Sequence, residues 1–80
     1  MLLEHLYSIF YIYPMKKKLT RRELEVLILS QEGLIAKEVA QRLNISVRTV
    51  ETYRRNINEK LEVNKVTAAI RSAILLGILS

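Results

Sequence analysis

Residues 43–55 read LNISVRTVETYRR, and they join two helical patterns through a very short break. Asn44 tolerates a left-handed backbone, and Ser46 has a side-chain oxygen that can cap the free N–H groups at the start of a helix. The pattern therefore predicts a helix from about Val47 to Leu61. Because only about three residues separate it from the preceding helix, the two cannot stack antiparallel along their lengths and should cross steeply.

The helix predicted after this break has two unlike faces. At about 3.6 residues per turn, one side carries a mainly apolar set: Val47, Val50, Arg54, Ile57 and Leu61. The other side carries Arg48, Glu51, Thr52 and Arg55. This polar face suits a groove lined by phosphates and base edges. The alternative is an ordinary solvated face on which Glu51 and Arg55, at i and i+4, form a surface ion pair.

Helical signals continue on both sides of this pair. Residues 20–23, TRRE, form a capping box before an apolar stripe of Leu24, Leu27, Ile28 and Gln31, and Gly33 ends that helix. A second helix is predicted at about Ala36–Leu43, and a fourth at about Lys65–Leu76, ended by Gly77. The sequence has no strand-like alternation and no internal repeat. The predicted fold class is all-α, with four short helices in one compact domain.

The composition excludes several functional classes. The chain has 80 residues, no cysteine and one histidine, His5, so disulfides, thiolate metal sites and catalytic triads are not expected. We therefore predict no enzyme activity, no cofactor and no metal, and the absence of cysteine fits a cytoplasmic protein. The net charge of +5 and the pI near 9.8 favour a polyanionic partner, with nucleic acid ahead of a membrane surface.

Residues 1–18 differ from the rest of the chain. Their first part, MLLEHLYSIFYIYP, holds four of the five aromatic residues and no Lys or Arg. It is too short to span a bilayer and lacks the charged start of a signal peptide. MKKK follows Pro14 as a basic linker. Two interpretations stay open: an apolar arm that packs on this domain or on a partner, or an upstream extension of a product that starts at Met15.

Two helices that cross steeply at a short turn form a helix-turn-helix. Its second helix enters the major groove of DNA, while the first lies across the backbone. In this arrangement Ala40 lies where the two helices approach closely, and Val50 and Ile57 hold the second helix on the domain. The polar face then turns outward from the N-terminal half of the second helix, which is the part that reaches base edges.

Several motifs occur in a fixed order along the chain. They are LTRRE at 19–23, KEVA at 37–40, ISVRTV at 45–50, INEKL at 57–61 and a late Gly77. Together they resemble the LuxR-type helix-turn-helix domain, which also occurs in FixJ and NarL response regulators and in small GerE-like regulators. The resemblance implies a domain at 19–80, with the helix-turn-helix at about 36–55, a recognition helix at about 47–61 and a dimerisation helix at about 65–76.

The resemblance implies a sequence-specific DNA-binding transcriptional regulator whose partner is double-stranded DNA. Matching positions assign DNA contacts to Lys37, Ser46, Arg48, Thr49, Glu51, Thr52, Tyr53 and Arg55. Lys37 and Thr49 resemble phosphate contacts. Glu51, Thr52 and Arg55 hold the positions that meet base edges, where Arg suits guanine, Glu suits the cytosine amino group and Thr suits a thymine methyl. Arg54 keeps two interpretations, a phosphate contact or a brace for Glu51.

Some residues depart from the family pattern. Ile35 stands where Ser or Thr usually caps the second helix, and loss of that acceptor typically costs about 1 kcal/mol. Tyr53 replaces a frequent His, although its hydroxyl could still donate to a phosphate. Glu62 replaces a common Gly, so the recognition helix is not expected to close through a left-handed glycine. Val66 and Ala68 replace a charged pair and make the last helix more apolar.

The last predicted helix has more apolar residues than one small core needs. The residues that can face inward are Ala69, Ile70, Ala73 and Leu76, which leaves Ala68, Leu75 and Leu79 partly exposed. In LuxR-type domains the corresponding helix often forms a two-fold contact. The resemblance therefore implies a homodimer through Ala68, Ser72, Leu75 and Leu79. Such a dimer would bind two half-sites about one turn of DNA apart.

Two other functions stay open on the sequence. A truncated LuxR-like chain could act as a protein-interaction module that titrates a full-length regulator by forming heterodimers. A sigma-factor-like promoter reader shares the motif but would normally be attached to other regions that bind RNA polymerase. The resemblance leaves room for a contact with RNA polymerase and gives no reason to expect a membrane partner. The 80 residues leave no room for a phosphoacceptor or sensing domain, so we expect any signal to act through protein amount, a partner or a missing portion.

Overall fold

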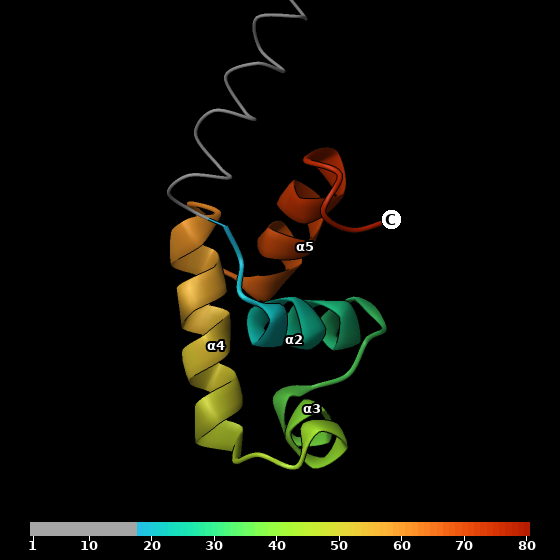
Figure 1. Ribbon diagram of the computed structural model, residues 1–80, viewed down its shortest axis with the longest axis vertical. Helices are drawn as coiled ribbons and strands as arrows, with labels where there is room; N and C mark the ends of the chain where they lie inside the picture. The colour runs from blue at the N-terminus through green and yellow to red at the C-terminus, as the bar shows by residue number, and fades with distance from the viewer. Residues whose placement is uncertain (1–17) are drawn as a thin grey trace, which may run out of the picture.

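The computed structural model describes residues 18–80, so the arm predicted at residues 1–18 lies outside the described residues except for Lys18. Four helices follow one another over this range: α2 (Arg21–Gln31), α3 (Ala36–Leu43), α4 (Val47–Lys60) and α5 (Val66–Leu75). Residues 18–80 contain no strand. In Figure 1, α2 lies at the centre, with α4 along one side of it, α3 below and α5 above. The predicted all-α class is confirmed.

The first described helix begins at the predicted capping box. Thr20 Oγ1 accepts a hydrogen bond from the Glu23 N–H at 3.1 Å, and Glu23 Oε1 accepts one from the Thr20 N–H at 2.8 Å. These two bonds satisfy N–H groups that have no partner within the helix. Shortly after α2 ends, Gly33 has a φ of 94°, which glycine adopts without strain. The sequence signals for both ends of α2 are therefore confirmed.

The inward face of α2 is rotated from the predicted one. The stripe predicted from apolar residues is wrong at Ile28 and Gln31, which are both exposed. The buried residues of α2 are Glu23, Val26, Leu27 and Ser30. Their spacing of three and four residues is a regular helical stripe, but two of its members are polar. Leu27 is buried and Leu24 packs against the core, so the predicted stripe is right at these two residues and misses the two buried polar ones.

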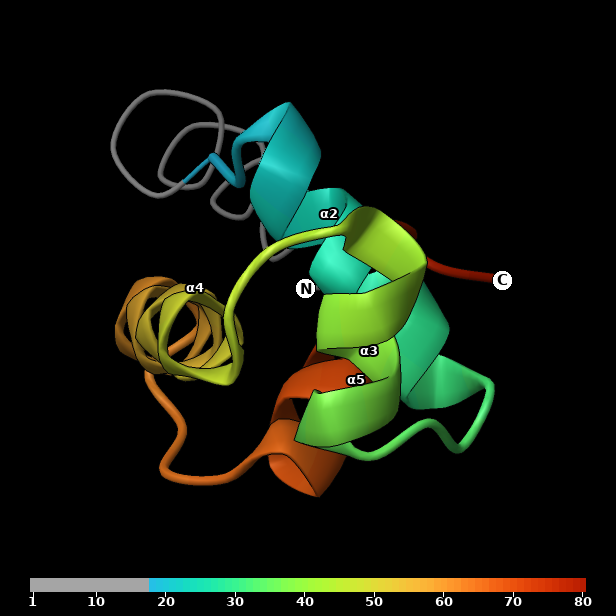
Figure 2. The ribbon, with the colours of Figure 1, turned by 90° about the horizontal axis from the view of Figure 1, so that it is seen from below.

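The corner between α3 and α4 forms at the predicted break. Asn44 has a left-handed φ of 57°, and the Ile45 N–H donates to the Ala40 carbonyl oxygen at 3.0 Å. Ser46 then caps α4, because its Oγ accepts a hydrogen bond from the Thr49 N–H at 3.0 Å. Figure 2 looks nearly along α4 and shows α3 crossing it steeply. Local hydrogen bonds thus set the angle between the two helices.

The hydrophobic core lies where the four helices meet. Its buried residues are Val26, Leu27, Val39, Ala40, Val50, Ile57, Leu61, Ala69, Ala73 and Leu79. α4 contacts all of the other described helices. Val50 and Ile57, on its inward side, are almost completely buried, as the sequence predicts. One side of α4 is therefore fixed by packing while the other stays open to solvent.

The C-terminus of α4 closes on a residue other than glycine. Glu62 has a φ of 56°, its N–H donates to the Glu59 carbonyl oxygen at 3.2 Å, and the Val63 N–H donates to the Asn58 carbonyl oxygen at 2.9 Å. This hydrogen-bond pattern ends many helices, usually with glycine at the left-handed position. As expected, no glycine closes this helix; Glu62 itself adopts the left-handed conformation. A side chain in that conformation costs roughly 1–2 kcal/mol.

Glu62→Gly is expected to have a free energy of unfolding about 0.5–1 kcal/mol higher than that of Glu62→Ala, because relief of the left-handed strain outweighs the extra freedom of the unfolded chain. In a domain of this size the gain corresponds to roughly 2–8 °C in Tm, measurable by thermal unfolding followed by circular dichroism. Glu62→Ala is the matched control, since it removes the same side chain and keeps the strain. A Tm for Glu62→Gly no higher than that of Glu62→Ala would contradict this explanation.

Candidate nucleic-acid interface

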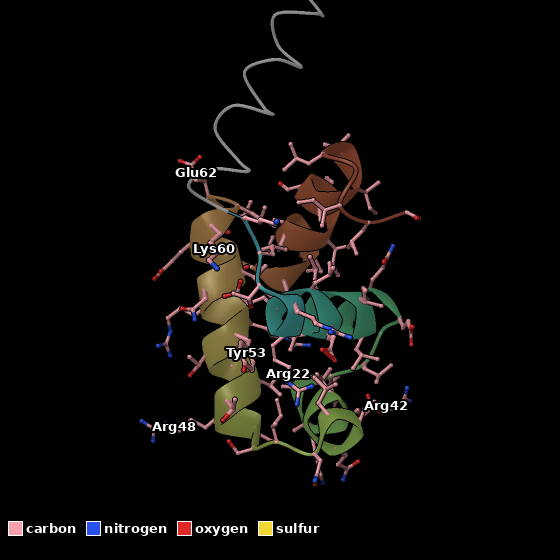
Figure 3. All side chains as sticks on the ribbon, in the orientation of Figure 1. Arg22, Arg42, Arg48, Tyr53, Lys60 and Glu62 are labelled. Carbon is pink, nitrogen blue, oxygen red and sulfur yellow. The ribbon has the colours of Figure 1, made fainter. Side chains whose placement is uncertain are left out.

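Four polar side chains form an exposed surface on the N-terminal half of α4, which we call the reading face. They are Arg48, Glu51, Thr52 and Arg55; all four are exposed, and together they line a shallow depression of about 430 Å³. Figure 3 shows Arg48 pointing away from α2 and α3. Among residues 18–80 no ion pair joins Glu51 to Arg55. The reading face is therefore not closed by the surface ion pair that the sequence offered as an alternative.

Hydroxyl groups around the reading face are partly engaged with the helix itself. The Ser46 and Thr49 side-chain oxygens lie 2.8 Å apart, beside the N-terminus of α4. Thr52 Oγ1 donates to the Arg48 carbonyl oxygen at 3.1 Å. Because its hydroxyl hydrogen is used in this bond, Thr52 offers a partner its methyl group and its oxygen lone pairs. Those features match a thymine methyl or the N–H donor of a base.

The start of α3 supplies a second exposed polar position. Lys37 lies in the first turn of α3 and is exposed. Ile35, at the N-cap, provides no side-chain acceptor, as the sequence predicts. The Glu38 carboxylate instead accepts a hydrogen bond from the Ile35 N–H at 2.9 Å, which is one half of a capping box. The backbone N–H groups of this first turn therefore lack the usual hydroxyl cap beside Lys37.

Tyr53 has a mixed environment. It is half-buried and packs against the hydrophobic core, and Figure 3 shows it on the side of α4 that faces α2. Most of its ring therefore contributes to packing. Any contact between Tyr53 and a phosphate would have to come from the hydroxyl end of the side chain. The predicted phosphate contact stays a prediction.

Arg54 turns inward, away from the reading face. Its Nη2 atom donates to Ser30 Oγ at 2.9 Å and to the Leu34 carbonyl oxygen at 3.2 Å. Burial lowers the pKa of the Arg54 guanidinium, while the nearby charge of Glu51 acts in the opposite direction. The helical pattern placed Arg54 on the apolar side of α4, but it could not identify Ser30 and Leu34 as partners, because they lie 24 and 20 residues away along the chain. Arg54 links α4 to the end of α2 and to the loop before α3.

One residue expected at the dimer contact is elsewhere. Leu75 is 79 % exposed, and Ala68 and Ser72 are half-buried, but Leu79 is only 8 % exposed and belongs to the core. The predicted exposure of Leu79 is wrong because α5 ends at Leu75, so helical spacing no longer applies beyond it. The N–H groups of Ile78 and Leu79 donate to the Ala73 carbonyl oxygen at 2.8 and 3.1 Å, which folds the chain back.

The apolar exposed part of α5 extends beyond the predicted residues. Ile74, which precedes Leu75 on α5, and Ile78, which follows the helix, are also exposed, and helical spacing did not single them out. Ile78 follows Gly77, where the chain has left the helix with a φ of 79°. Helical periodicity could not show which of the last residues face outward. Within residues 18–80, no helix is long and apolar enough to cross a membrane.

Comparisons with known proteins agree with this architecture. The family described as "Bacterial regulatory proteins, luxR family" matches residues 17–73. The uncharacterized response regulatory protein YgeK of Escherichia coli (strain K12) is 41 % identical over 66 residues, which cover 82 % of this chain and 45 % of YgeK. The transcriptional regulatory protein LiaR of Bacillus subtilis (strain 168) is 45 % identical over 53 residues, which cover 66 % of this chain and 25 % of LiaR. The chain thus spans less than half the length of these two relatives.

A solved structure has a similar fold. The crystal structure of the response regulator ChrA, from a heme-sensing two-component system, superposes with a TM-score of 0.78 at 32 % identity. The match covers 90 % of this chain and 36 % of ChrA. The family match covers more than half of the chain and includes α2, α3 and α4 in full. The chain therefore belongs to the LuxR family of bacterial regulatory proteins and has its DNA-binding helix-turn-helix domain.

Proposed function

We propose that this protein is a transcriptional regulator that binds duplex DNA sequence-specifically by inserting the N-terminal half of α4 into the major groove. The observation that carries the proposal is the exposed reading face on a helix whose opposite side is buried. α3 crosses this helix steeply, as the first helix of a helix-turn-helix does when it lies across the DNA backbone. The net charge of +5 adds a general attraction to DNA.

Affinity and selectivity would come from different residues. Phosphate contacts supply most of the affinity of such proteins and carry no sequence information. Lys37, Ser46 and Thr49 surround the N-termini of α3 and α4, where backbone N–H groups also favour an anion. Base contacts would come from Glu51, Thr52 and Arg55 on the reading face, with Arg48 at the margin of the groove.

We further propose that the protein binds DNA as a homodimer through the exposed side of α5. Leu75 supports this contact, because a large apolar side chain that is mostly exposed becomes more stable when a partner removes it from water. Ala68 and Ser72 would lie beside it, whereas Leu79 no longer belongs to the contact. In Figure 1, α5 lies at the opposite end of the domain from the N-terminal half of α4. A second copy could therefore bind α5 while both reading faces meet successive major grooves.

Arg55→Ala and Lys37→Ala are expected to weaken DNA binding in different ways. Arg55→Ala should lose discrimination at one base pair, worth roughly 1–3 kcal/mol, because a bidentate contact to guanine disappears. Lys37→Ala should weaken cognate and random DNA alike and reduce the salt dependence, because it removes one phosphate contact. The measurement is affinity for a site selected from random DNA and for a shuffled duplex, each at several salt concentrations.

Arg42→Ala is the matched control for these two variants. Arg42 is exposed at the end of α3 and lies on the side of α3 that faces away from α4 (Figure 3). Its loss should change neither affinity nor discrimination beyond the general effect of one charge. Equal losses on cognate and random DNA for Arg55→Ala and Lys37→Ala would contradict the division of roles. Absence of any salt-sensitive DNA binding would instead favour the protein-interaction module.

Leu75→Arg is expected to leave the domain folded and to abolish dimer formation, because a charge replaces the most exposed apolar side chain of α5. Analytical ultracentrifugation with and without DNA should give a dimer mass for the wild-type chain and a monomer mass for the variant. Asn64→Arg adds the same charge at an exposed position before α5 and should stay dimeric. A wild-type monomer mass at every concentration, with and without DNA, would refute the dimer.

A further inference from the structure

The Arg54 guanidinium joins its own helix to two other segments of the chain. It projects from the middle of α4, and its Nη2 atom donates both to Ser30 Oγ in the last turn of α2 and to the Leu34 carbonyl oxygen in the loop before α3. Ser30 Oγ in turn donates to the Val26 carbonyl oxygen at 2.8 Å. A continuous line of hydrogen bonds therefore runs from the backbone of α2 to the helix that carries the reading face.

The surroundings of Arg54 hold part of its guanidinium inside the domain. Its Nε atom is enclosed and has no hydrogen-bond partner among the described residues. The guanidinium remains charged at neutral pH, and a partly buried charge is stable only while its hydrogen bonds are kept. To turn its Nη2 atom toward a phosphate, Arg54 would have to give up the bonds to both Ser30 and Leu34. An inward role is therefore more favourable than a phosphate contact.

The position of Arg54 relates its bonds to the reading face. Arg54 directly precedes Arg55 and lies one turn beyond Glu51 on the same helix, so any rotation of α4 moves all three residues together. Base contacts discriminate only when the side chains meet base edges with correct geometry. A guanidinium whose Nη2 atom bonds to two other segments opposes both rotation and sliding of α4.

We propose that Arg54 is a positioning residue for base discrimination: it fixes the orientation of α4 against the end of α2 and the loop before α3, and does not contact DNA. This inference rests on the proposed DNA-binding function. It predicts that loss of Arg54 lowers selectivity without removing a phosphate contact. If Arg54 bound a phosphate, its loss would instead reduce the slope of log K against log salt by about 0.9 and leave selectivity unchanged.

The experiment compares Arg54→Met with the wild-type full-length chain on a selected site and on a shuffled duplex, across a range of salt. Methionine keeps an aliphatic stem and removes the donors. The ratio of specific to random affinity should fall by about tenfold, the scale of one misplaced base contact, while the salt slope stays within error of the wild-type slope. Lys37→Met provides the contrast, because it should reduce the slope and leave the ratio unchanged.

Two further variants keep the test decisive if Arg54→Met folds poorly. Ser30→Ala leaves Arg54 in place and removes one of its hydrogen-bond partners far from the reading face. It should lower the ratio of specific to random affinity without changing the salt slope. Arg54→Lys keeps a charge that suits a phosphate but lacks the planar guanidinium that presents Nη2 to both acceptors, so it should also lose selectivity. The inference is overturned if Arg54→Met reduces the salt slope and Arg54→Lys restores the wild-type slope. It is also overturned if Ser30→Ala and Arg54→Lys are folded and both keep wild-type selectivity. A wild-type chain without salt-sensitive binding would instead overturn the proposed function.

Discussion

Lys60→Met is expected to lower the free energy of unfolding by about 3–5 kcal/mol at neutral pH, the usual cost of leaving a buried charge without its partner. Lys60 Nζ lies 2.7 Å from Glu23 Oε1, and the exposed fractions of the two side chains are 29 % and 4 %. The pair is therefore asymmetric. If Glu23 is neutralised, Lys60 can turn toward water, but if Lys60 is removed, the Glu23 carboxylate stays enclosed.

The pH dependence of this effect follows from the pKa of Glu23. Burial alone would raise that pKa, but the hydrogen bond and charge of Lys60, together with the bonds to Thr20, hold it below its ordinary value. In the wild type the stabilisation is thus fully present above the ordinary pKa and is lost as pH falls through the lowered one. In Lys60→Met, burial is opposed only by Thr20, so the pKa of Glu23 is higher than in the wild type and the variant loses less stability as pH falls. The difference in free energy of unfolding between the wild type and Lys60→Met should therefore become smaller as the pH falls.

Urea unfolding at neutral pH and near pH 4 measures both parts of this prediction. Glu23→Gln is the matched variant, because glutamine can still accept from the Thr20 N–H and carries no charge. Glu23→Gln should cost less than Lys60→Met, and the double variant should recover part of the Lys60→Met loss. The explanation would be contradicted if Lys60→Met lost the same stability at both pH values. It would also be contradicted if that loss were no larger than the loss for Glu23→Gln.

The burial of Glu23 also explains why the predicted inward face of α2 was partly wrong. The ends of α2 followed from local chemistry, since a capping box and a glycine act on neighbouring residues. Its buried face did not, because Glu23 and Ser30 occupy core positions through partners on α4, Lys60 and Arg54. These partners are 37 and 24 residues away. No local pattern could show that two polar residues belong inside.

A similar limit applies at the C-terminus and at the reading face. Leu79 turns into the core because the chain leaves the helix after Leu75, a tertiary event that spacing alone does not contain. Exposure of Glu51, Thr52 and Arg55 could be predicted, since their helix also carries a clear apolar side. Arg54 falls on the apolar side of the same helix, but its partners could not be predicted, because a long arginine side chain can turn inward or out to solvent.

Ala40→Leu is expected to cost about 1–3 kcal/mol of stability or more, because Ala40 is 4 % exposed in a closed core and the added atoms have no space. Its carbonyl oxygen also accepts the Ile45 N–H at the corner, so a shift of α3 disturbs the start of α4.

This displacement predicts a particular loss of function. Phosphate contacts tolerate a small movement of α3 better than base contacts tolerate one of α4, so Ala40→Leu should lose more affinity for a selected site than for a shuffled duplex. Measurements belong below the Tm of the variant, with the folded fraction checked by circular dichroism. Gln41→Leu adds an apolar side chain on the exposed side of the same helix. It should change stability by no more than about 0.5 kcal/mol and leave selectivity intact. Full selectivity in folded Ala40→Leu would contradict the idea that close contact between α3 and α4 at Ala40 orients the reading face.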